Sequence, residues 1–328
     1  MGQMPNSRSN DAILVTGAAG FIGSYVCEFL IEKNFRIVGL DNFSNGNLNN
    51  LKSVTGNSNF AFIEIDVCDT EKLIQIMKEH DFAEVWHLAA NTDIITSHES
   101  PIRDFKDCAE ATVSVLEAMR QTNTKKIIFA SSGSVYGELG KGLAVTEDVG
   151  PLKPLSTYGA GKLASEGFIA AYTNLYDIDG FIFRFGNVLG DRINHGVIFD
   201  FAKKLKKNPS QLQILGNGRQ EKNYFRVGDC INGMWTISRI SEAQCLIINL
   251  GNSSLTNVTR IAEIVVEESK LENVELSVQG VDLAWPGDQP IIRLNCSQAL
   301  KYGWSCKTDS DEAVRLTAGE LLRKAGVL

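Results

Sequence analysis

The chain lacks several features that would place it in particular classes of protein. Its seven cysteines are odd in number and contain no C-x-x-C pair, so neither a disulfide framework nor a zinc site is expected. Scattered unpaired cysteines are typical of the reducing cytoplasm, and we expect a cytoplasmic protein without a metal. No run of about 18 apolar residues occurs, which argues against a membrane-spanning helix. Residues 1–10 are polar and lack the apolar core of a signal peptide, so a disordered tail is expected there.

The chain also has fewer basic than acidic residues. The chain has 32 lysine and arginine residues against 39 aspartate and glutamate residues, a formal net charge of -7. Nucleic acids and acidic membranes bind basic surfaces that replace the counterions of their phosphates, so we expect neither as a partner. A small ligand that carries phosphate is compatible with this charge, because a few local groups suffice to bind it.

The chain up to Gly186 shows a regular alternation of apolar runs and amphipathic stretches. Runs rich in Val, Ile and Phe, among them AILVTG, FRIVGLD and KKIIFASS, are separated by stretches with helical periodicity. Such runs are typical of parallel strands covered on both faces, so we predict an α/β fold with a Rossmann-type doubly wound parallel sheet. The large domain is predicted over residues 11–186, with returns near 223–250. A smaller C-terminal α/β lobe is predicted mainly over residues 187–328.

A glycine-rich turn follows the first of these runs. In ILVTGAAGFIGS, Gly17, Gly20 and Gly23 lie between a predicted strand and an amphipathic helix. Glycines there let the backbone approach a pyrophosphate, which then meets the free N–H groups and the dipole of the helix N-terminus. Asp41 ends the next strand, where its carboxylate can accept hydrogen bonds from an adenosine ribose and would repel a 2′-phosphate. The pattern favours NAD over NADP; the alternative is a tight strand-helix turn without a ligand.

Other strand ends border the same predicted crevice. Asp66 and Val67 end the run FIEIDV, and Ala89 follows the strand in VWHLAA. In an open parallel sheet ligands bind at the carboxyl ends of the strands, and small residues there leave room for a dinucleotide. Each of these residues is alone compatible with ordinary strand-end structure. His87 has apolar neighbours and is interpreted as a packed, hydrogen-bonded residue rather than as a base.

Three polar side chains are predicted to carry the chemistry. Ser132 lies at the end of the strand in IIFASSGSVYGE, while Tyr158 and Lys162 are one helical turn apart in STYGAGK. A free tyrosine has a pKa of about 10 and is a poor base, but a lysine ammonium and a nicotinamide cation both stabilise its phenolate. Proton transfer with a substrate hydroxyl then becomes feasible, with Ser132 hydrogen-bonded to the same oxygen. The alternative is an exposed tyrosine and a solvated lysine on a helix.

In combination, the motifs resemble the extended short-chain dehydrogenase/reductase family, and within it the NAD-dependent nucleotide-sugar epimerases and dehydratases typified by UDP-glucose 4-epimerase. The resemblance covers nearly the whole chain, through TGAAGFIGS, DNFSNG, HLAA, SSGSVYG, YGAGK, RFGNVLG, LGNGRQ and WPGDQP. It implies that Ser132, Tyr158 and Lys162 are catalytic. The NAD contacts that it implies are Gly17, Gly20, Phe21, Ile22, Gly23, Asp41, Asn42, Asp66, Val67, Ala89, Tyr158 and Lys162. The substrate contacts that it implies are Ser132, Ser134, Asn187, Val197, Leu215 and Lys222.

The residues after Ser132 indicate the reaction. In the family, 4,6-dehydratases carry an Asp-Glu pair there and decarboxylases a glutamate, because eliminating water or handling a carboxylate needs further acid or base groups. This chain has Gly133 and Ser134 instead. One tyrosine base, one serine and a bound NAD suffice to oxidise a carbinol to a ketone and return the hydride. If the ketone rotates in between, the net reaction is epimerisation, most simply at C4 of the sugar.

The resemblance therefore predicts an isomerase of carbohydrate metabolism that acts on a nucleotide sugar and recycles tightly bound NAD. The alternative on the same scaffold is a dehydratase, reductase or decarboxylase. A non-catalytic NAD-binding protein is a further alternative, although such a protein has no need of the tyrosine base.

Three positions depart from the family pattern. Lys222 and Trp285 stand where the family commonly has arginines that hold the diphosphate of the substrate, and Cys108 replaces a usual asparagine. Lys222 still offers a point charge, without the bidentate fork of arginine. Trp285 is compatible with stacking on a base or sugar, or with core packing. The departures bear on the substrate and leave the cofactor chemistry untouched.

Two predicted helices are richer in apolar residues than one core-facing stripe requires. They lie around DFKDCAEATVSVLEAMRQT and GKLASEGFIAAYTNLY, where Ala, Val, Leu, Met, Phe and Ile occupy several faces. By resemblance to the family, these helices pair with their copies about a two-fold axis, so a homodimer is expected.

Overall fold

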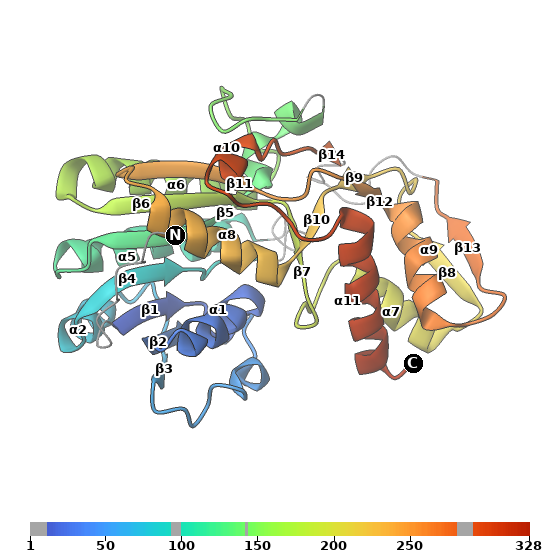
Figure 1. The fold of residues 1–328 in the computed structure, drawn as a ribbon, viewed down its shortest axis with the longest axis horizontal. Helices are drawn as coiled ribbons and strands as arrows, with labels where there is room; N and C mark the ends of the chain where they lie inside the picture. The colour runs from blue at the N-terminus through green and yellow to red at the C-terminus, as the bar shows by residue number, and fades with distance from the viewer. Residues whose placement is uncertain (1–11, 93–99, 142–143, 281–290) are drawn as a thin grey trace.

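A seven-stranded parallel sheet forms the centre of the computed structural model, which describes residues 12–92, 100–141, 144–280 and 291–328 (Figure 1). The strand order is β11-β6-β5-β4-β1-β2-β3. The strands are β1 (Ala12–Thr16), β2 (Arg36–Asp41), β3 (Phe60–Glu64), β4 (Phe82–His87), β5 (Lys126–Ser132), β6 (Asp179–Phe185) and β11 (Cys245–Leu250). This arrangement confirms the predicted doubly wound α/β fold.

Helices cover both faces of the sheet (Figure 1). Ile13 and Val15 of β1 pack with α1 (Phe21–Glu32) and α8 (Val227–Ile240) on one face. Leu14, between them in sequence, packs on the opposite face against α2 (Thr70–Glu79), α5 (Ala111–Arg120) and α6 (Thr157–Tyr176). Because successive side chains of a strand point to opposite faces, a continuous apolar run is what a strand buried on both sides requires.

The order in which the chain adds strands to the sheet reverses at β1. From β1 the chain proceeds outward to β2 and β3, and then returns so that β4 pairs with the other side of β1. In open parallel sheets such a switch point leaves a crevice at the carboxyl ends of the strands, where ligands bind. The glycine-rich turn after β1 and the serines at the end of β5 both lie at this end of the sheet.

The helix predicted over residues 104–122 is helical without a break from 101 to 120, but it is not α-helical throughout. The structure has α4 (Pro101–Asp104), then a π-helical segment (Phe105–Glu110), and then α5. A π turn widens a helix and is frequent at functional sites. Here the segment approaches α6 so closely that a Cβ at Gly161 would lie 3.0 Å from both the Asp104 carbonyl oxygen and the Cys108 Cβ. This contact depends on tertiary packing, which the apolar pattern alone does not encode.

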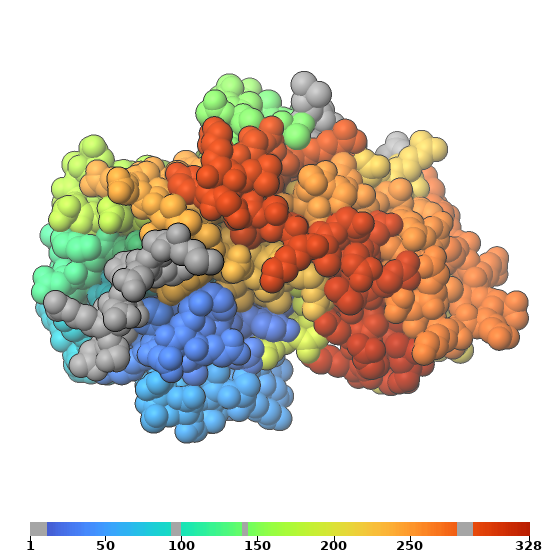
Figure 2. All heavy atoms as spheres, viewed as in Figure 1, coloured from blue at the N-terminus to red at the C-terminus, as the bar shows by residue number. Residues whose placement is uncertain are grey.

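The C-terminal part forms a lobe at the right of Figures 1 and 2 and has a core of its own. The core is built mainly by α7 (Val197–Lys207), β8 (Gln211–Ile214), α9 (Val258–Ser269) and α11 (Ser310–Ala325), and β13 (Glu275–Val278) pairs with β8 at its edge. The remaining elements are η1 (Leu48–Leu51), η3 (Gly133–Tyr136), η4 (Glu138–Lys141), β7 (Asn187–Leu189), β9 (Glu221–Lys222), β10 (Tyr224–Arg226), β12 (Thr256–Asn257), β14 (Ile291–Ile292) and α10 (Ser297–Lys301). Among the residues that the structure describes, no helix combines the length and apolar character needed to span a membrane.

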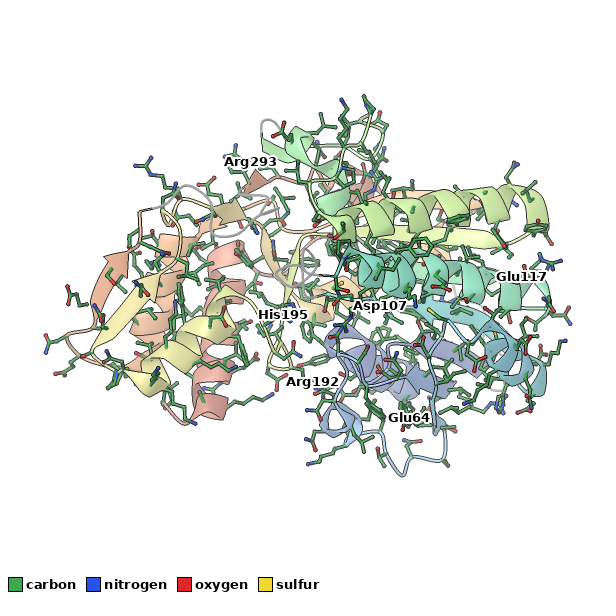
Figure 3. The ribbon with its side chains drawn as sticks, turned by 180° about the vertical axis from the view of Figure 1, so that it is seen from behind. Glu64, Asp107, Glu117, Arg192, His195 and Arg293 are labelled. Atoms are coloured by element: carbon green, nitrogen blue, oxygen red, sulfur yellow. The ribbon has the colours of Figure 1, made fainter. Side chains whose placement is uncertain are left out.

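Arg192 connects this part to the helix after the glycine turn (Figure 3). Its guanidinium donates to Ser24 Oγ at 3.0 Å and to Glu28 Oε1 at 2.5 Å, both on α1, and stacks over the Tyr25 ring at 4.1 Å from its centroid. The loop after β7 is therefore fixed to the helix that borders the crevice.

Candidate active site

The glycine-rich turn requires glycine for two physical reasons. Gly17 has a φ of +69°, and a Cβ there would lie 2.8 Å from the backbone nitrogen of Ala89. A Cβ at Gly23 would lie 2.0 Å from the carbonyl oxygen of Gly17, so α1 packs directly on the turn. Within α1, which the structure describes in full, Gly20 gives no side-chain cap and the first turn carries no acidic residue. The helix N-terminus can therefore receive an anion such as a pyrophosphate.

Asp41 lies beside this turn at the end of β2. Its carboxylate accepts hydrogen bonds from the backbone N–H groups of Ala19, at 2.9 Å, and Phe43, at 2.8 Å. Burial raises the pKa of this carboxyl, and the hydrogen bonds from backbone N–H groups oppose the shift. The side chain is 8% exposed, so a fixed carboxylate borders the crevice where an adenosine ribose would lie.

We expect Asp41→Ala to weaken NAD binding by about 10- to 100-fold, because a charge-assisted hydrogen bond contributes about 1.5–3 kcal/mol. Calorimetric titration of the apoprotein measures the effect. Asp41→Asn, which keeps an acceptor of the same shape, is the control and should retain more affinity. A wild type that prefers NADP would contradict the assignment.

The other predicted cofactor residues surround the same turn. Phe21 and Ile22 are the first two residues of α1. Asn42 Nδ2 donates to Asp66 Oδ2 at 3.2 Å, which joins the ends of β2 and β3, and Val67 next to it is 7% exposed. The structure thus gathers residues from three strand ends into one crevice, and this set fits a dinucleotide.

Ser132, Tyr158 and Lys162 lie together at the other side of the crevice. Ser132 ends β5, and its hydroxyl interacts with the phenol of Tyr158 on α6. Lys162 Nζ lies 5.9 Å from the centre of the Tyr158 ring. Burial raises the pKa of Tyr158 well above its usual value, while the Ser132 hydrogen bond lowers it. Without further positive charge, the tyrosine is therefore held in its protonated form.

Lys162 is buried and held in one orientation. Its Nζ donates to the carbonyl oxygen of Ala130 at 2.7 Å and lies 4.7 Å from the centre of the Phe129 ring. Burial lowers the pKa of this ammonium, while the neighbouring Cys108 and Glu166 raise it. A desolvated cation near the phenol can stabilise a phenolate more strongly than a solvated one, because the local dielectric constant is low.

Gly133 is enclosed on several sides. A Cβ there would lie 3.1 Å from Ile292 Cγ2, 3.2 Å from the carbonyl oxygen of Phe185 and 3.4 Å from Leu294 Cδ2. Ser134, the next residue, turns back toward the strand, with its N–H and its Oγ each 3.1 Å from Ser132 Oγ. A side chain at the position after Ser132 would therefore require its neighbours to shift by a few tenths of an ångström.

The predicted substrate residues fall into two groups. Asn187 follows β6 and its Nδ2 donates to the carbonyl oxygen of Asn223 at 3.3 Å, while Lys222 pairs in register with Ile292, which borders Gly133. These two residues are thus linked to the catalytic end of β5. Val197 begins α7, and Leu215, which is 46% exposed, follows β8, so both belong to the C-terminal part.

The three departures from the family pattern are placed differently. Trp285 lies outside the described residues. Lys222 is half-buried in β9, and Cys108 is buried in the π-helical segment against Gly161. Burial raises the pKa of the Cys108 thiol, and the Lys162 ammonium beside it lowers that pKa.

His87 is packed and hydrogen-bonded, as predicted. Thr16 Oγ1 accepts the backbone N–H groups of Leu88 and Ala89, both at 3.2 Å, so its own proton is directed to His87 Nδ1 at 2.7 Å. The Nε2 atom then carries the ring proton and donates to Thr112 Oγ1 at 3.1 Å. Burial lowers the pKa of His87 to about 3, so the ring is neutral and ties β1 and β4 to α5.

Sequence reasoning missed one polar side chain at the site. Asp104 is completely buried and contacts the first residue of α6. It belongs to none of the quoted motifs. No sequence signal identifies it, because its contacts are with Asn91 and Thr157, which lie elsewhere along the chain.

The glycine turn with an acidic residue at the end of β2, and a serine facing a Tyr-x-x-x-Lys turn, define a nicotinamide-dependent enzyme of the short-chain dehydrogenase type. The model of the NAD-dependent epimerase/dehydratase family matches residues 13–251, and the chain belongs to this family. NAD is its cofactor.

Known epimerases resemble the chain over most of its length. The putative UDP-glucose 4-epimerase of Methanocaldococcus jannaschii is 34% identical over 92% of this chain and 96% of that protein. A solved UDP-galactose 4-epimerase is 33% identical, with a TM-score of 0.81 over 95% of this chain and 99% of that one. The UDP-glucuronic acid 4-epimerase of Bacillus cereus, solved with UDP-glucuronic acid and NAD, is 28% identical with a TM-score of 0.84 over the same shares.

Proposed function

We propose that the protein is an NAD-dependent nucleotide-sugar 4-epimerase that acts on a UDP-sugar. The observation that carries the proposal is the combination of Ser132, Tyr158 and Lys162 with the enclosed position of Gly133. The site offers one base and one hydroxyl, and a tightly enclosed glycine follows Ser132 in place of the additional acid that a dehydratase or decarboxylase requires. The UDP-sugar substrates of the similar epimerases support the choice of nucleotide.

Each catalytic side chain has a defined task. NAD, when bound, accepts a hydride from the sugar carbon and returns it, and the glycine turn and Asp41 would hold it. Ser132 orients the sugar hydroxyl, and Tyr158 removes its proton as the carbinol becomes a 4-ketone. Lys162 stabilises the phenolate from a buried, fixed position. After the ketone has rotated to present its opposite face, return of the hydride to that face inverts the configuration at C4, and Tyr158 gives the proton back to the same oxygen.

The proposed function is tested by incubating the purified protein with UDP-glucose, UDP-galactose, UDP-glucuronic acid and UDP-N-acetylglucosamine. NMR of the sugar protons distinguishes the outcomes. Interconversion of C4 epimers without net consumption of NAD is expected. Loss of water or of carbon dioxide would instead indicate the dehydratase or decarboxylase alternative, and NAD binding without any turnover would indicate a non-catalytic protein.

A homodimer is proposed from the exposed apolar face of α6. Phe168 and Leu175 are 44% and 64% exposed, and with Ala164 and Ala171 they form one stripe at helical spacing. Ile102, 63% exposed, adds an apolar side chain on α4 nearby in the helical layer. A stripe of this kind fits pairing with a second copy about a two-fold axis.

We expect sedimentation velocity at micromolar concentration to give the mass of a dimer. Phe168→Glu should shift the distribution to the monomer, because it places a charge in an apolar interface. Lys203→Glu, a substitution on α7 far along the chain from this stripe, serves as the control. A monomeric wild type would rule out the proposed assembly.

We further infer that the two parts of the chain bind different ligands. Residues 11–186, with returns near 223–250, would form the NAD-binding domain, and residues 187–328 mainly the substrate-binding lobe. Arg192, which bonds to α1 from the loop after β7, supports a coupling between the two. A cytoplasmic location remains the prediction from cysteine usage.

A further inference from the structure

Asp104 is a buried carboxylate to which no motif assigns a task. It ends α4 and is 0% exposed. Its Oδ1 accepts a hydrogen bond from Asn91 Nδ2 at 2.8 Å, and its Oδ2 accepts one from Thr157 Oγ1 at 2.6 Å. A carboxylate is costly to bury, so its place among specific donors calls for an explanation beyond packing.

The two partners of Asp104 belong to opposite sides of the active site. Asn91 follows the end of β4, two residues after Ala89, which contacts the glycine-rich turn. Thr157 is the first residue of α6 and directly precedes Tyr158. Asp104 therefore bridges the edge of the cofactor crevice and the helical turn that carries the base.

The contact between α4 and α6 is tight on the backbone side as well. The carbonyl oxygen of Asp104 would lie 3.0 Å from a Cβ at Gly161, one residue before Lys162. Ser156 caps α6 by accepting the N–H of Gly159 at 3.1 Å, so the first turn is fixed from both ends. A displacement of Asp104 would be transmitted to both catalytic residues of the helix.

The charged and titratable groups that face Tyr158 act in opposite directions. They are Asp104 from α4, Cys108 from the π-helical segment, and Lys162 from α6, and the Ser132 hydroxyl faces it from β5. Burial is the largest cause of the raised pKa of Tyr158, the Cys108 and Asp104 side chains raise it further, and the Ser132 hydrogen bond lowers it. Asp104 is thus on the side that disfavours the phenolate.

We propose that Asp104 is a positioning residue for the base, because it holds the first turn of α6 in register with the cofactor crevice. As a second effect, its carboxylate adds to the burial that raises the pKa of Tyr158. The inference rests on the proposed function for the role of Tyr158. The second effect works in the same direction as burial, and the positive charge of the bound cofactor would oppose both.

The test compares Asp104→Asn with the wild type. An asparagine has one acceptor oxygen, so it loses one of the two hydrogen bonds and sets an N–H group against a donor. We expect kcat to fall by at least about tenfold with little change in KM, because the misplaced base affects the chemical step. Removal of the negative charge favours the phenolate, so the acidic limb of the kcat profile should move to lower pH.

Three further variants separate the two effects. Thr157→Val removes the hydroxyl and keeps the charge, so kcat should fall while the acidic limb stays in place. Asp107 lies in the same helical layer, and its partly exposed carboxylate pairs with Arg103 at 3.1 Å (Figure 3). Asp107→Asn should leave both kcat and the acidic limb unchanged. In the double variant Asn91→Asp with Asp104→Asn, the amide and the carboxylate exchange places. A donor then again faces an acceptor between positions 91 and 104, and kcat should recover in part.

A second readout is independent of any sugar substrate. The ionisation of Tyr158 is followed by ultraviolet difference titration of the NAD-loaded protein, with Tyr158→Phe as the blank. In Asp104→Asn the phenol should ionise at lower pH than in the wild type. This readout tests Asp104 even if no nucleotide sugar is epimerised, so failure of the inference and failure of the proposed function are distinguishable.

Several results would overturn the inference. A folded Asp104→Asn protein with wild-type kcat and an unshifted pH profile is one of them. A shift of the acidic limb equal to that caused by Asp107→Asn is another, since it would mean that any nearby carboxylate has the same effect. If Asp104→Asn does not fold, an unchanged kcat in Thr157→Val would be sufficient to refute the positioning role.

Discussion

Replacing Tyr158 with phenylalanine is expected to lower kcat by about 10³-fold, within the range of 10² to 10⁴ typical of a lost general acid-base group. The phenol is the only group of the proposed set that removes and returns the substrate proton. Its ring remains in Tyr158→Phe, and the variant leaves Lys162 hydrogen-bonded to Ala130. The KM for the UDP-sugar and the amount of bound NAD should therefore stay near their wild-type values.

Tyr172→Phe is the matched control for this experiment. Tyr172 lies on the same helix, is half-buried, and has its hydroxyl 3.5 Å from Glu117, well along the helix from the active site. Loss of that hydroxyl should leave kcat unchanged. Turnover of Tyr158→Phe at close to the wild-type rate would remove the tyrosine from the mechanism and with it the proposed role of Ser132.

Acidification is expected to destabilise the protein through His87. The ring stays neutral in the folded protein because its pKa is lowered to about 3, whereas the unfolded chain takes up a proton near 6.5. Between these values the unfolded state binds the extra proton, so the stabilising contribution is complete above about pH 6.5 and is lost as the pH falls. The free energy of unfolding should decrease by about 1.4 kcal/mol per pH unit from this residue, about 2 kcal/mol by pH ~5.

The hydrogen bonds around the ring give the reason in atomic terms. A second ring proton on Nδ1 would face the Thr16 hydroxyl, whose acceptor capacity is already used by the N–H groups of Leu88 and Ala89. Urea unfolding with excess NAD, repeated from about pH 7 to about pH 5, measures the slope. His87→Gln should reduce the slope. Equal slopes for wild type and His87→Gln would contradict the assignment.

The strands and the catalytic residues were predictable because their signals are local. Apolar runs identified all strands of the sheet up to β6, since a strand covered on both faces has to be apolar throughout. Tyr158 and Lys162 could be placed on one face of a helix from their spacing alone. The glycine turn could be recognised because strand, glycines and helix follow one another directly in sequence.

The features that were not predictable depend on segments far apart in the chain. The role of Asp104 depends on its hydrogen bonds with Asn91 and Thr157, and the π-helical segment depends on the close approach of Gly161. The surroundings of Gly133 come from β14, whose register against β9 no local pattern specifies. Such contacts are set by tertiary packing, and the same residues in another arrangement would have been an ordinary helix cap or an ordinary turn.

The walls around Gly133 impose an order on the mutations by which this chain could acquire a different reaction. An aspartate introduced at position 133 first would meet Ile292 and the carbonyl oxygen of Phe185, and a buried carboxylate without partners is strongly destabilising. Removing the Ile292 Cγ2 methyl, as in Ile292→Ala, relieves one of these two contacts beforehand, at about 2–5 kcal/mol. The same acid is thus more deleterious in one genetic background than in another, so the order of the substitutions affects the stability of the intermediates on a path from epimerase to dehydratase.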